Sequence, residues 1–587
     1  MQSHYDAQLK DTVRYLGKTL GETIKAQLGN DWLEKIEKIR LDGRASYQGD
    51  TDCGSSLKET FKTMSDSELL VVARAFAQFL NLGNIAEQEY NAGLDVEASI
   101  DSLFEHLDKA ELSALEVEEA VAKLDIDLVL TAHPTEVFRR TLIHKHKELA
   151  VCLKSIHHEQ LTDTERKRLE TRIADLISQA WHTEEIRSVR PTPVDEARWG
   201  FSVIENSLWE AVPEFLRDLD ERLQQDYNVA LPIDAAPIHF SSWMGGDRDG
   251  NPFVTAKVTE EVLLLARRRA AKLLTIDLDR LQVELSMNLC NDELKARAGE
   301  QLEPYRAILR PLVKRCADTR DGIADFFNGR PYDASTWIQD NDELLEPLML
   351  CYQSLCDCGL ETTANGMLLD TIRRVKCFGI HLLRLDVRQD SQRHADVLAE
   401  LTRYLGLGDY GQWSEADKQA FLLRELSSKR PLFPRAWQPS EDVQEVLDTC
   451  KVIANHSRHG FGIYIISMAS EASDVMAVQL LLQEMGVDWP MPVAPLFETL
   501  DDLNNSPTVM RKLLSVDWYR GYIQGKQFVM IGYSDSAKDA GAIAAGWAQY
   551  ESQEALVALA EEFDVTLTLF HGRGGTIGRG GLPAHAA

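Results

Sequence analysis

The chain has 587 residues, of which 44% are hydrophobic and 27% charged, proportions that exclude a disordered protein and fit a soluble globular one. Its 93 acidic residues outnumber its 63 basic residues, and the formal net charge is −30. Such a charge disfavours nucleic acids and anionic membranes as partners, because both carry negative phosphate groups. An anionic substrate would therefore have to be held by arginines gathered in one place.

The cysteines and the apolar segments of the sequence indicate the cellular compartment. Nine cysteines are scattered without CxxC pairs, which argues against a disulfide framework and against a zinc site. The opening MQSHYDAQLK has no apolar signal core, and no run approaches the ~20 apolar residues that a membrane span needs. We therefore expect a cytoplasmic protein.

The first predicted element is an amphipathic helix. Between Leu9 and Leu28, leucine, valine and isoleucine recur at three- and four-residue spacing and form one apolar stripe. Loop signals follow in LDGRASYQGDTDCGSS and NAGLDVEASI. We expect residues 1–124 to form an N-terminal helical region. Later patterns of the same kind predict long helices over residues 162–187, 200–223 and 257–288.

Short β-prone apolar runs lie among the helices seven times, and each ends in polar or charged residues. Such runs predict parallel strands with crossover helices. Reactive side chains just past the strand ends match the catalytic face of an eight-stranded α/β barrel. For residues 125–587 we predict a predominantly α-helical TIM-type barrel with large helical insertions and without its eighth strand. The strand-end segments are residues 126–136, 238–252, 380–390, 461–470, 492–502, 527–539 and 567–581.

The segment VLTAHPTEVFRR places His133 directly after a strand that we expect to be buried. A histidine there could act as a general base, since its unperturbed pKa lies near neutrality, or it could cap the start of a helix. Arg139 and Arg140 on the following helix could bind an anion or face solvent.

The segment SWMGGDRDGNP packs two glycines, alternating charges and Trp243 into a tight turn. A calcium loop is excluded, because Pro252 stands where the turn glycine belongs and no glutamate closes the loop. The glycines suggest that the backbone approaches something closely. From this segment alone, a structural turn with an internal Arg–Asp pair is the favoured interpretation.

Glu498 and Asp535 each end a strand, in LFETLDD and GYSDSAKD. Two carboxylates on one face of a barrel could hold Mg²⁺ or Mn²⁺, with water and substrate oxygens at the remaining positions. Lys538, three residues after Asp535, could equally be an ion-pair partner.

The segment FHGRGGTIGRGG is the sharpest functional signal. Six glycines surround Arg573 and Arg579, and His571 stands at the strand end. Glycine allows close approach to an oxyanion, and arginine grips a carboxylate or phosphate with two parallel hydrogen bonds. The segment is neither a Walker loop nor a dinucleotide fingerprint. A disordered RGG-type tail is the alternative, but the adjoining apolar strand and the acidic chain argue against it.

Together, LVLTAHPTE, SWMGGDRDGNP, LRLDVRQD, APLFETLDDL, GYSDSAKDAG and FHGRGGTIGRGG resemble the motifs of the phosphoenolpyruvate carboxylase family of bacterial type, in that family's order. The resemblance implies a carboxy-lyase that joins phosphoenolpyruvate and bicarbonate into oxaloacetate and phosphate, an anaplerotic carbon fixation. It also implies Mg²⁺ or Mn²⁺ as cofactor and a homotetramer at full length, with neither nucleic acid nor membrane as partner.

The resemblance assigns roles by motif position. The implied metal ligands are Glu498 and Asp535. The implied substrate-binding residues are Arg388, Arg573 and His571. The implied catalytic residues are His133, Lys538 and Arg579. In the family's scheme, bicarbonate attacks the phosphoryl group, the histidine takes the carboxyphosphate proton, and the enolate captures the released CO₂.

Members of this family continue well beyond the final GGLPAHAA. The part beyond would carry the eighth strand, further phosphate-gripping arginines and much of the tetramer contact. We therefore expect this chain to be a fragment that is poorly soluble or inactive by itself. The alternative is a non-catalytic short subunit that pairs with a full-length or C-terminal carboxylase piece.

Overall fold

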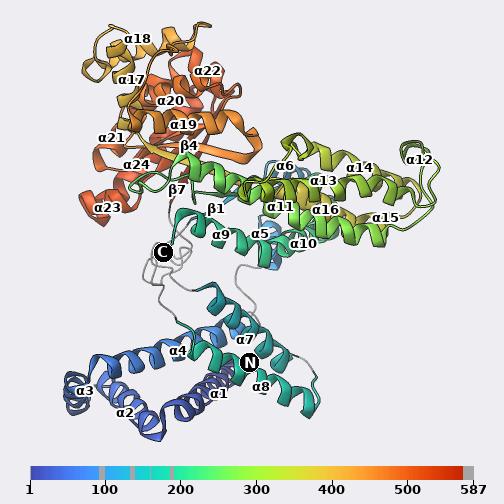
Figure 1. Ribbon diagram of the computed structural model, residues 1–587, viewed down its shortest axis with the longest axis vertical. Coiled ribbons are helices and arrows are strands. Elements are labelled where there is room, and N and C mark those ends of the chain that lie inside the picture. Colours follow the sequence, from blue (N-terminus) through green and yellow to red (C-terminus); the bar gives the residue numbers. More distant parts are fainter. Residues whose placement is uncertain are drawn as a thin grey trace. The chain divides into compact units, whose positions relative to one another are not determined.

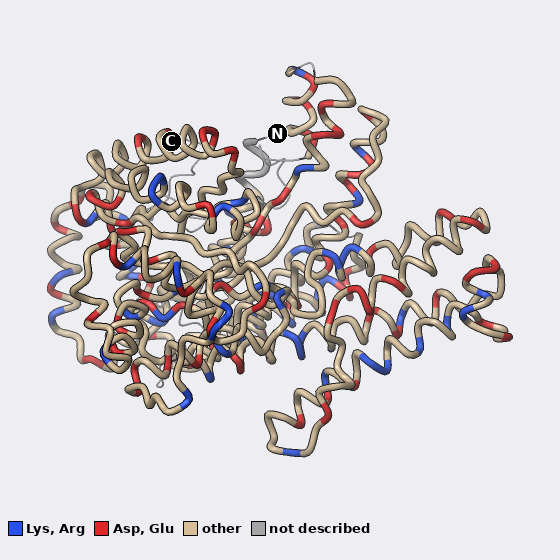
Figure 2. The backbone as a smooth tube through the Cα atoms, turned by 90° about the horizontal axis from the view of Figure 1, so that it is seen from above, with Lys and Arg blue, Asp and Glu red and all other residues tan. Residues whose placement is uncertain are grey.

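The computed structural model describes residues 2–91, 100–110, 112–131, 139–158, 160–184 and 191–572. The chain divides into two compact units. Unit 1 comprises Met1–Glu111 and His133–Arg190, and unit 2 comprises Leu112–Ala132 and Pro191–Ala587. The predicted boundary at residue 124 stays a prediction. Acidic and basic residues are interspersed along the helices of both units (Figure 2).

The described part of unit 1 is helical. The stripe predicted for its first helix is confirmed, because Leu16, Leu20 and Ile24 are buried where that helix packs against α4 and α8. Thr162 caps the start of α8, as the predicted start at residue 162 requires, but α8 ends at Trp181 rather than at residue 187. The helices are α1 (Gln2–Leu28), α2 (Asn30–Tyr47), α3 (Thr51–Thr63), α4 (Asp66–Asn91), α5 (Ile100–Lys109), α7 (Arg140–His158) and α8 (Asp163–Trp181).

The loop predicted over LDGRASYQGDTDCGSS is wrong, because most of that segment lies in α2 and α3. Only residues 48–50 separate the two helices. Asp50 ends the turn by accepting hydrogen bonds from the backbone N–H groups of Asp52 and Cys53, which caps α3. The sequence pattern correctly indicated a turn, but the turn is only three residues long. Of the second predicted loop, residues 92–99 lie outside the described residues.

Within the described residues, one helix, at Asp66–Tyr90 in α4, is long and apolar enough by length and composition to cross a membrane. This is weak evidence, because core helices of soluble proteins have the same properties. The helix packs against α1 and α7 (Figure 1).

Unit 2 contains all seven predicted strands, and they form one parallel sheet in the order β1 to β7. The third strand begins at Arg384, four residues after the predicted start, because residues 379–383 form a turn in which Leu382 has a φ of 67°. The strands are β1 (Ile126–Leu130), β2 (Ile238–Ser242), β3 (Arg384–Asp390), β4 (Phe461–Ser467), β5 (Val493–Phe497), β6 (Lys526–Ile531) and β7 (Thr566–His571).

Helices make up most of the rest of unit 2. The helix predicted over residues 200–223 belongs to a longer run in which a π-helical turn, Ile204–Leu208, joins α9 to α10, and the helix predicted over 257–288 is α11. The helices are α6 (Ala114–Ala122), α9 (Pro193–Val203), α10 (Trp209–Tyr227), α11 (Ala256–Glu284), α12 (Asp292–Ala298), α13 (Pro304–Phe327), α14 (Asp342–Asp357), α15 (Glu361–Thr363), α16 (Leu369–Cys377), α17 (Ser391–Tyr404), α18 (Glu415–Leu426), α19 (Glu441–Asn455), α20 (Ala472–Met485), α21 (Leu500–Leu514), α22 (Asp517–Ile523), α23 (Ser534–Ala540) and α24 (Ala542–Glu562).

Strand order explains the shape of the sheet. Each strand pairs with the one before it in the chain, and right-handed crossovers between such neighbours place the connecting helices on one face. The sheet curls around its other face into a half-barrel. A barrel-like fold is therefore confirmed, whereas closure by an eighth strand stays a prediction.

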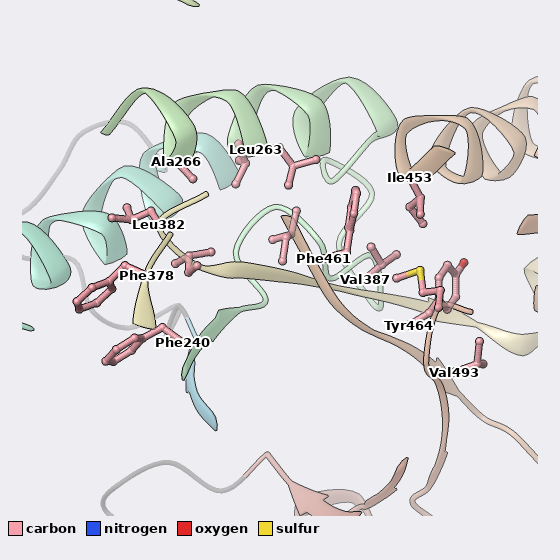
Figure 3. Close-up of a cluster of buried hydrophobic side chains, with 14 of the residues drawn as sticks. Phe240, Leu263, Ala266, Phe378, Leu382, Val387, Ile453, Phe461, Tyr464 and Val493 are labelled. Carbon is pink, nitrogen blue, oxygen red and sulfur yellow. The ribbon is translucent and has the colours of Figure 1, made fainter. Parts of the chain in front are cut away.

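The main core lies between the helices and the outer face of the sheet (Figure 3). The rings of Phe240 on β2 and Phe378 stack with their centroids 4.8 Å apart. Leu263 of α11 and Ile453 of α19 lie in the same buried cluster as Val387 of β3. This apolar layer holds the strands in register, so that their carboxyl ends form one rigid edge.

The strand before His133 is not buried as predicted. Ile126 and Leu128 of β1 are 43% and 46% exposed, whereas β5 is buried throughout. Within the described residues, β1 pairs only with β2 and forms an edge of the sheet. An apolar run therefore identified the strand correctly but not its position in the sheet.

Candidate active site at the strand ends

Charged side chains gather at the carboxyl ends of the strands of unit 2, and five of the predicted site residues are among them. Arg388 lies near the end of β3, Glu498 follows β5, Asp535 and Lys538 lie on α23 after β6, and His571 ends β7. Three predicted site residues lie outside the described residues: His133, Arg573 and Arg579.

The loop after β2 is joined to β3 through the backbone around Arg388. The N–H of Arg388 donates to the carbonyl of Gly246 at 3.0 Å, and the N–H of Arg248 donates to the carbonyl of Arg388 at 2.9 Å. These bonds extend the parallel pairing with β3 past the end of β2. The loop and the strand therefore form one rigid frame.

This frame directs two aspartates at one arginine. A terminal nitrogen of Arg388 lies 2.6 Å from a carboxylate oxygen of Asp249, and its Nε lies 3.1 Å from Asp247. The guanidinium carbon also lies 5.7 Å from the centre of the Trp243 ring, a distance at which a cation and an aromatic face attract. Three contacts thus orient the guanidinium of a side chain that remains 19% exposed.

The internal Arg–Asp pair predicted for this turn is wrong. Arg248 is buried and donates instead to the carbonyl of Gly246 at 2.9 Å and to the hydroxyl of Thr259 at 2.6 Å. The aspartates on either side of it pair with Arg388 of the neighbouring strand. Because side chains alternate along an extended segment, Arg248 and the two aspartates face opposite sides.

Glu498 is held at the end of β5 by the backbone of the neighbouring strands. Its Oε1 accepts a hydrogen bond of 3.0 Å from the N–H of Met468, which follows β4 with a φ of 54°. A left-handed conformation is unfavourable for methionine, and such strain concentrates at functional sites. A Cβ atom on Gly532 would stand 2.7 Å from the Cα of Glu498, so the chain after β6 requires glycine there.

The charges around Glu498 indicate which groups share its site. Burial raises the pKa of Glu498, and the Met468 N–H and the Arg388 guanidinium oppose that rise. The carboxylates of Asp249 and Asp535 raise it further. Residues from the loop after β2, from β3, from the end of β5 and from α23 therefore act on one another through space.

The ends of β6 and β7 add exposed groups. The Nζ of Lys538 lies 2.9 Å from Oδ1 of Asp535, which confirms the ion pair that the sequence left open. Tyr533, two residues before Asp535, meets the ring of His571 edge to face, with centroids 5.4 Å apart. These contacts bring His571 and Asp535 to one part of the site.

A small apolar cluster lies beside these charges. Ile465 of β4, Leu496 of β5 and Met530 of β6 are buried together, and Trp243 and Phe570 pack against them. The cluster is separate from the core between sheet and helices. Its side chains come from four neighbouring strands and from the loop after β2, so the site combines charged groups with an apolar wall.

The donor set fits a divalent metal ion with oxygen ligands. Magnesium in proteins is often held by one or two carboxylates, with water and substrate oxygens as further ligands. Glu498 uses one oxygen for the Met468 N–H, and its other oxygen accepts no hydrogen bond from the described residues. Within the described residues, no three or more His, Cys, Asp or Glu side chains are placed so that they alone could hold a metal ion, so water and substrate oxygens would have to complete the coordination.

Comparison with known proteins decides the family. The family model described as Phosphoenolpyruvate carboxylase matches residues 9–587. The chain belongs to the phosphoenolpyruvate carboxylase family. Proteins named phosphoenolpyruvate carboxylase from Aeromonas hydrophila and Tolumonas auensis are each 56% identical to it, over 99% of this chain and 67% of their own length. One from Pectobacterium carotovorum is 55% identical over the whole chain and 68% of its own length.

Sequence reasoning missed three structural features of the candidate site in this member of the phosphoenolpyruvate carboxylase family. It did not assign Asp247 and Asp249 to Arg388, did not foresee the ring of Trp243 beneath that guanidinium, and did not single out Asp386. One available signal was the alternation in RLDVRQD, which places Arg384, Asp386 and Arg388 on one face of β3.

Proposed function

We propose that this chain binds phosphoenolpyruvate at the strand ends of unit 2 and carboxylates it with bicarbonate to give oxaloacetate and phosphate. The family match along residues 9–587 supports the reaction. The observation that carries the location is the convergence of Arg388, Glu498 and Asp535 at the ends of neighbouring parallel strands. Active sites of α/β barrels lie at this end of the strands.

Arg388 is proposed to bind the anionic substrate. An arginine offers a planar fork of donors that matches a carboxylate or a phosphate. Asp247 and Asp249 occupy part of that fork and fix its direction, and the guanidinium stays partly exposed. Arg573 and Arg579, which the family resemblance places in the same site, would add positive charge for substrate binding and near the bicarbonate.

Glu498 and Asp535 are proposed to hold Mg²⁺ or Mn²⁺. Glu498 lies near the carboxylates of Asp249 and Asp535, and the described cations beside them, Arg388 and Lys538, are already paired with aspartates. A trianionic substrate would be repelled by such a group unless a cation were added. When bound, the metal ion would supply Lewis-acid charge neutralisation to the substrate oxygens.

Proton transfer is proposed to fall to His133, with Lys538 and His571 nearby in the site. His133 would take the proton of carboxyphosphate, a role that suits a side chain with a pKa near neutrality. The partly buried rings of Trp243 and Phe570, which pack against Ile465, Leu496 and Met530, would keep water from the enolate carbon and give released CO₂ an apolar surface. Both tasks protect the carbon that must attack CO₂.

Three further properties belong to this proposal and rest on family resemblance. They are an eight-stranded TIM-type barrel in the complete protein, a homotetrameric assembly and a cytoplasmic location. The half-barrel of unit 2 supports the first, because its strand order is that of a barrel whose strands follow one another around the wall.

Calorimetric titration of the chain with phosphoenolpyruvate in the presence of Mg²⁺ tests the site. Binding is expected, and Arg388→Ala is expected to abolish it. Arg393→Ala is the matched control. Arg393, like Arg388, is an arginine paired with aspartate, but it lies on α17, outside the site. Unchanged binding in Arg388→Ala would contradict the proposal.

Oxaloacetate formation tests the reaction, and it is expected to require bicarbonate as well as phosphoenolpyruvate. Phosphate release that does not depend on bicarbonate would contradict the carboxylase assignment. The binding measurement is independent of whether the isolated chain turns over, so it tests the site even if the predicted inactivity of the chain is correct.

A further inference from the structure

Trp243, directly after β2, connects three parts of the strand-end site. Its indole N–H donates to Oδ2 of Asp386 at 3.0 Å. Its ring centre lies 5.7 Å from the guanidinium carbon of Arg388. A Cβ atom on Gly572 would stand 3.2 Å from Cη2 of the ring, so the chain leaving β7 passes its edge. One indole therefore lies against two residues of β3 and against the chain that leaves β7.

Asp386 is fixed to the backbone of β4. The residue is 3% exposed, and its Oδ1 accepts a hydrogen bond of 2.9 Å from the N–H of Ile463. A Cβ atom on Gly462 would lie 2.1 Å from the same oxygen, so a residue larger than glycine would push the carboxylate away. With one donor on each oxygen, the carboxylate has a single defined orientation.

Burial of this carboxylate lowers the stability of the fold. Asp386 makes no ion pair within the described residues, and the nearby cation Arg384 pairs with Asp127 instead, at 3.6 Å. Burying a carboxylate without a cation is unfavourable. An ionised carboxylate can accept both N–H groups, whereas the terminal group of an asparagine has one acceptor and one donor. A group that costs stability and is held this firmly points to a task other than packing.

We propose that Asp386 is a positioning residue that fixes the plane of the Trp243 indole and, through it, the direction of the Arg388 guanidinium. Asp386 and Arg388 are two residues apart on β3 and therefore lie on the same face of the strand, where the indole contacts both. The inference rests on the proposed function, because it takes Arg388 as a substrate-binding residue.

Fluorine NMR of the chain labelled with 5-fluorotryptophan tests the first step without substrate. The chain has eleven tryptophans, and Trp243→Phe identifies the Trp243 resonance. Asp386→Asn is expected to shift that resonance and to leave the Trp209 resonance in place. Trp209 is a suitable internal reference, because its N–H donates to a different buried aspartate, Asp277, at 2.8 Å.

Asp220→Asn is the matched control variant, since Asp220 also accepts a backbone N–H, from Leu231 at 2.8 Å, and does not bond to Trp243. It is expected to leave the Trp243 resonance in place. A Trp243 resonance that does not move in Asp386→Asn would overturn the proposal. This readout needs neither substrate binding nor turnover, so it decides the inference even where the proposed function fails.

A double-mutant cycle tests the second step, from the indole to Arg388. Asp386→Asn is expected to weaken phosphoenolpyruvate binding about tenfold, measured by calorimetry with Mg²⁺. In a Trp243→Phe background, which has no indole N–H, the same substitution is expected to have no further effect. Equal weakening in both backgrounds would overturn the proposal, because Asp386 would then act without Trp243. Absence of binding by the unsubstituted chain would instead count against the proposed function.

Discussion

The helical layer and the strand ends of unit 2 each hold a tryptophan beside an aspartate and an arginine. We call the group in the helices closed, because its arginine pairs with the aspartate that binds the tryptophan, and the group at the strand ends open, because its arginine does not. In the closed group, Trp209 of α10 donates its N–H to Asp277 of α11 at 2.8 Å, and its ring centre lies 5.7 Å from the guanidinium carbon of Arg374 of α16. Arg374 also pairs directly with Asp277, at 3.2 Å, and is only 5% exposed. All three side chains bond to one another away from solvent.

The group at the strand ends consists of the same three residue types, but its side chains are paired differently. Trp243 again donates to an aspartate, Asp386, and again lies 5.7 Å from an arginine, Arg388. Here the arginine pairs with Asp247 and Asp249 of a loop rather than with the buried aspartate, and it is 19% exposed.

The difference separates a structural group from a group whose arginine is proposed to bind substrate. In the helical layer, Arg374 and Asp277 neutralise each other, so the group can only stabilise the packing of three helices. At the strand ends, the cation and the buried anion are kept apart by the indole. The Arg388 side chain therefore remains partly exposed at the strand ends, and the buried aspartate is proposed to hold the indole.

The largest expected effect is on the closed group. Asp277→Asn leaves Arg374 buried without its buried counter-charge and is expected to lower the free energy of unfolding by about 3–5 kcal/mol. Denaturant unfolding of unit 2, followed by intrinsic fluorescence, measures this. Phosphoenolpyruvate binding should be unaffected under conditions in which the variant is folded. A variant as stable as the unsubstituted chain would show that Glu210, the other carboxylate on Arg374, is a sufficient partner.

A substitution in the open group should change substrate affinity and leave stability unchanged. Arg388→Lys keeps the charge and loses the planar fork, so phosphoenolpyruvate affinity is expected to fall about 100-fold while the denaturation midpoint stays the same. Arg393→Lys on α17 is the matched control and should change neither quantity. A large loss of stability with unchanged affinity would mean that the strand-end group is structural after all.

The strand ends should also depend on charge at the proposed metal site. Glu498→Gln removes one carboxylate charge and is expected to weaken Mn²⁺ binding about 30-fold, measured by electron paramagnetic resonance. Glu445→Gln is the control, because Glu445 likewise accepts a backbone N–H, from Ala256, but lies on α19. Equal Mn²⁺ affinity in the two variants would remove Glu498 from the metal site.

The strands and the principal site residues could be predicted because their signals are local. Each apolar run identified a strand, and a polar residue directly after it had to lie at the edge where parallel strands end. On that basis Arg388 and Glu498 were expected at this edge, where the structure has them, and their roles stay predictions. The exposure of β1 could not be foreseen, since an apolar run is the same at the edge and in the middle of a sheet.

The groups compared above could not be predicted, because their partners are distant along the chain. Trp209 and Asp277 are separated by 68 residues, and Arg388 and Asp249 by 139. Asp249 lies beside Arg248 in the sequence, so an internal pair was the natural interpretation. Only the pairing of the loop backbone with β3 turns the aspartate toward Arg388.

The smallest expected effect concerns the pH dependence of stability and separates the two buried aspartates. Asp386 has no ion pair within the described residues, and its charged surroundings are Asp127 of β1 and Arg384 of β3. Burial raises its pKa to about 7, whereas Arg374 opposes the rise for Asp277. The folded chain therefore keeps a proton on Asp386 that the unfolded chain has released, and this contribution to stability is lost as the pH rises through 7.

Asp386→Asn has no such proton to lose. Between about pH 6 and pH 8, the free energy of unfolding of the unsubstituted chain should fall by about 1 kcal/mol relative to that of Asp386→Asn. Denaturant midpoints of the two proteins at both pH values measure the difference. A constant difference would mean that Asp386 is ionised throughout the range, as expected of an aspartate with a cation beside it. The strand-end group would then be closed like the group in the helices, and the distinction between them would rest on exposure alone.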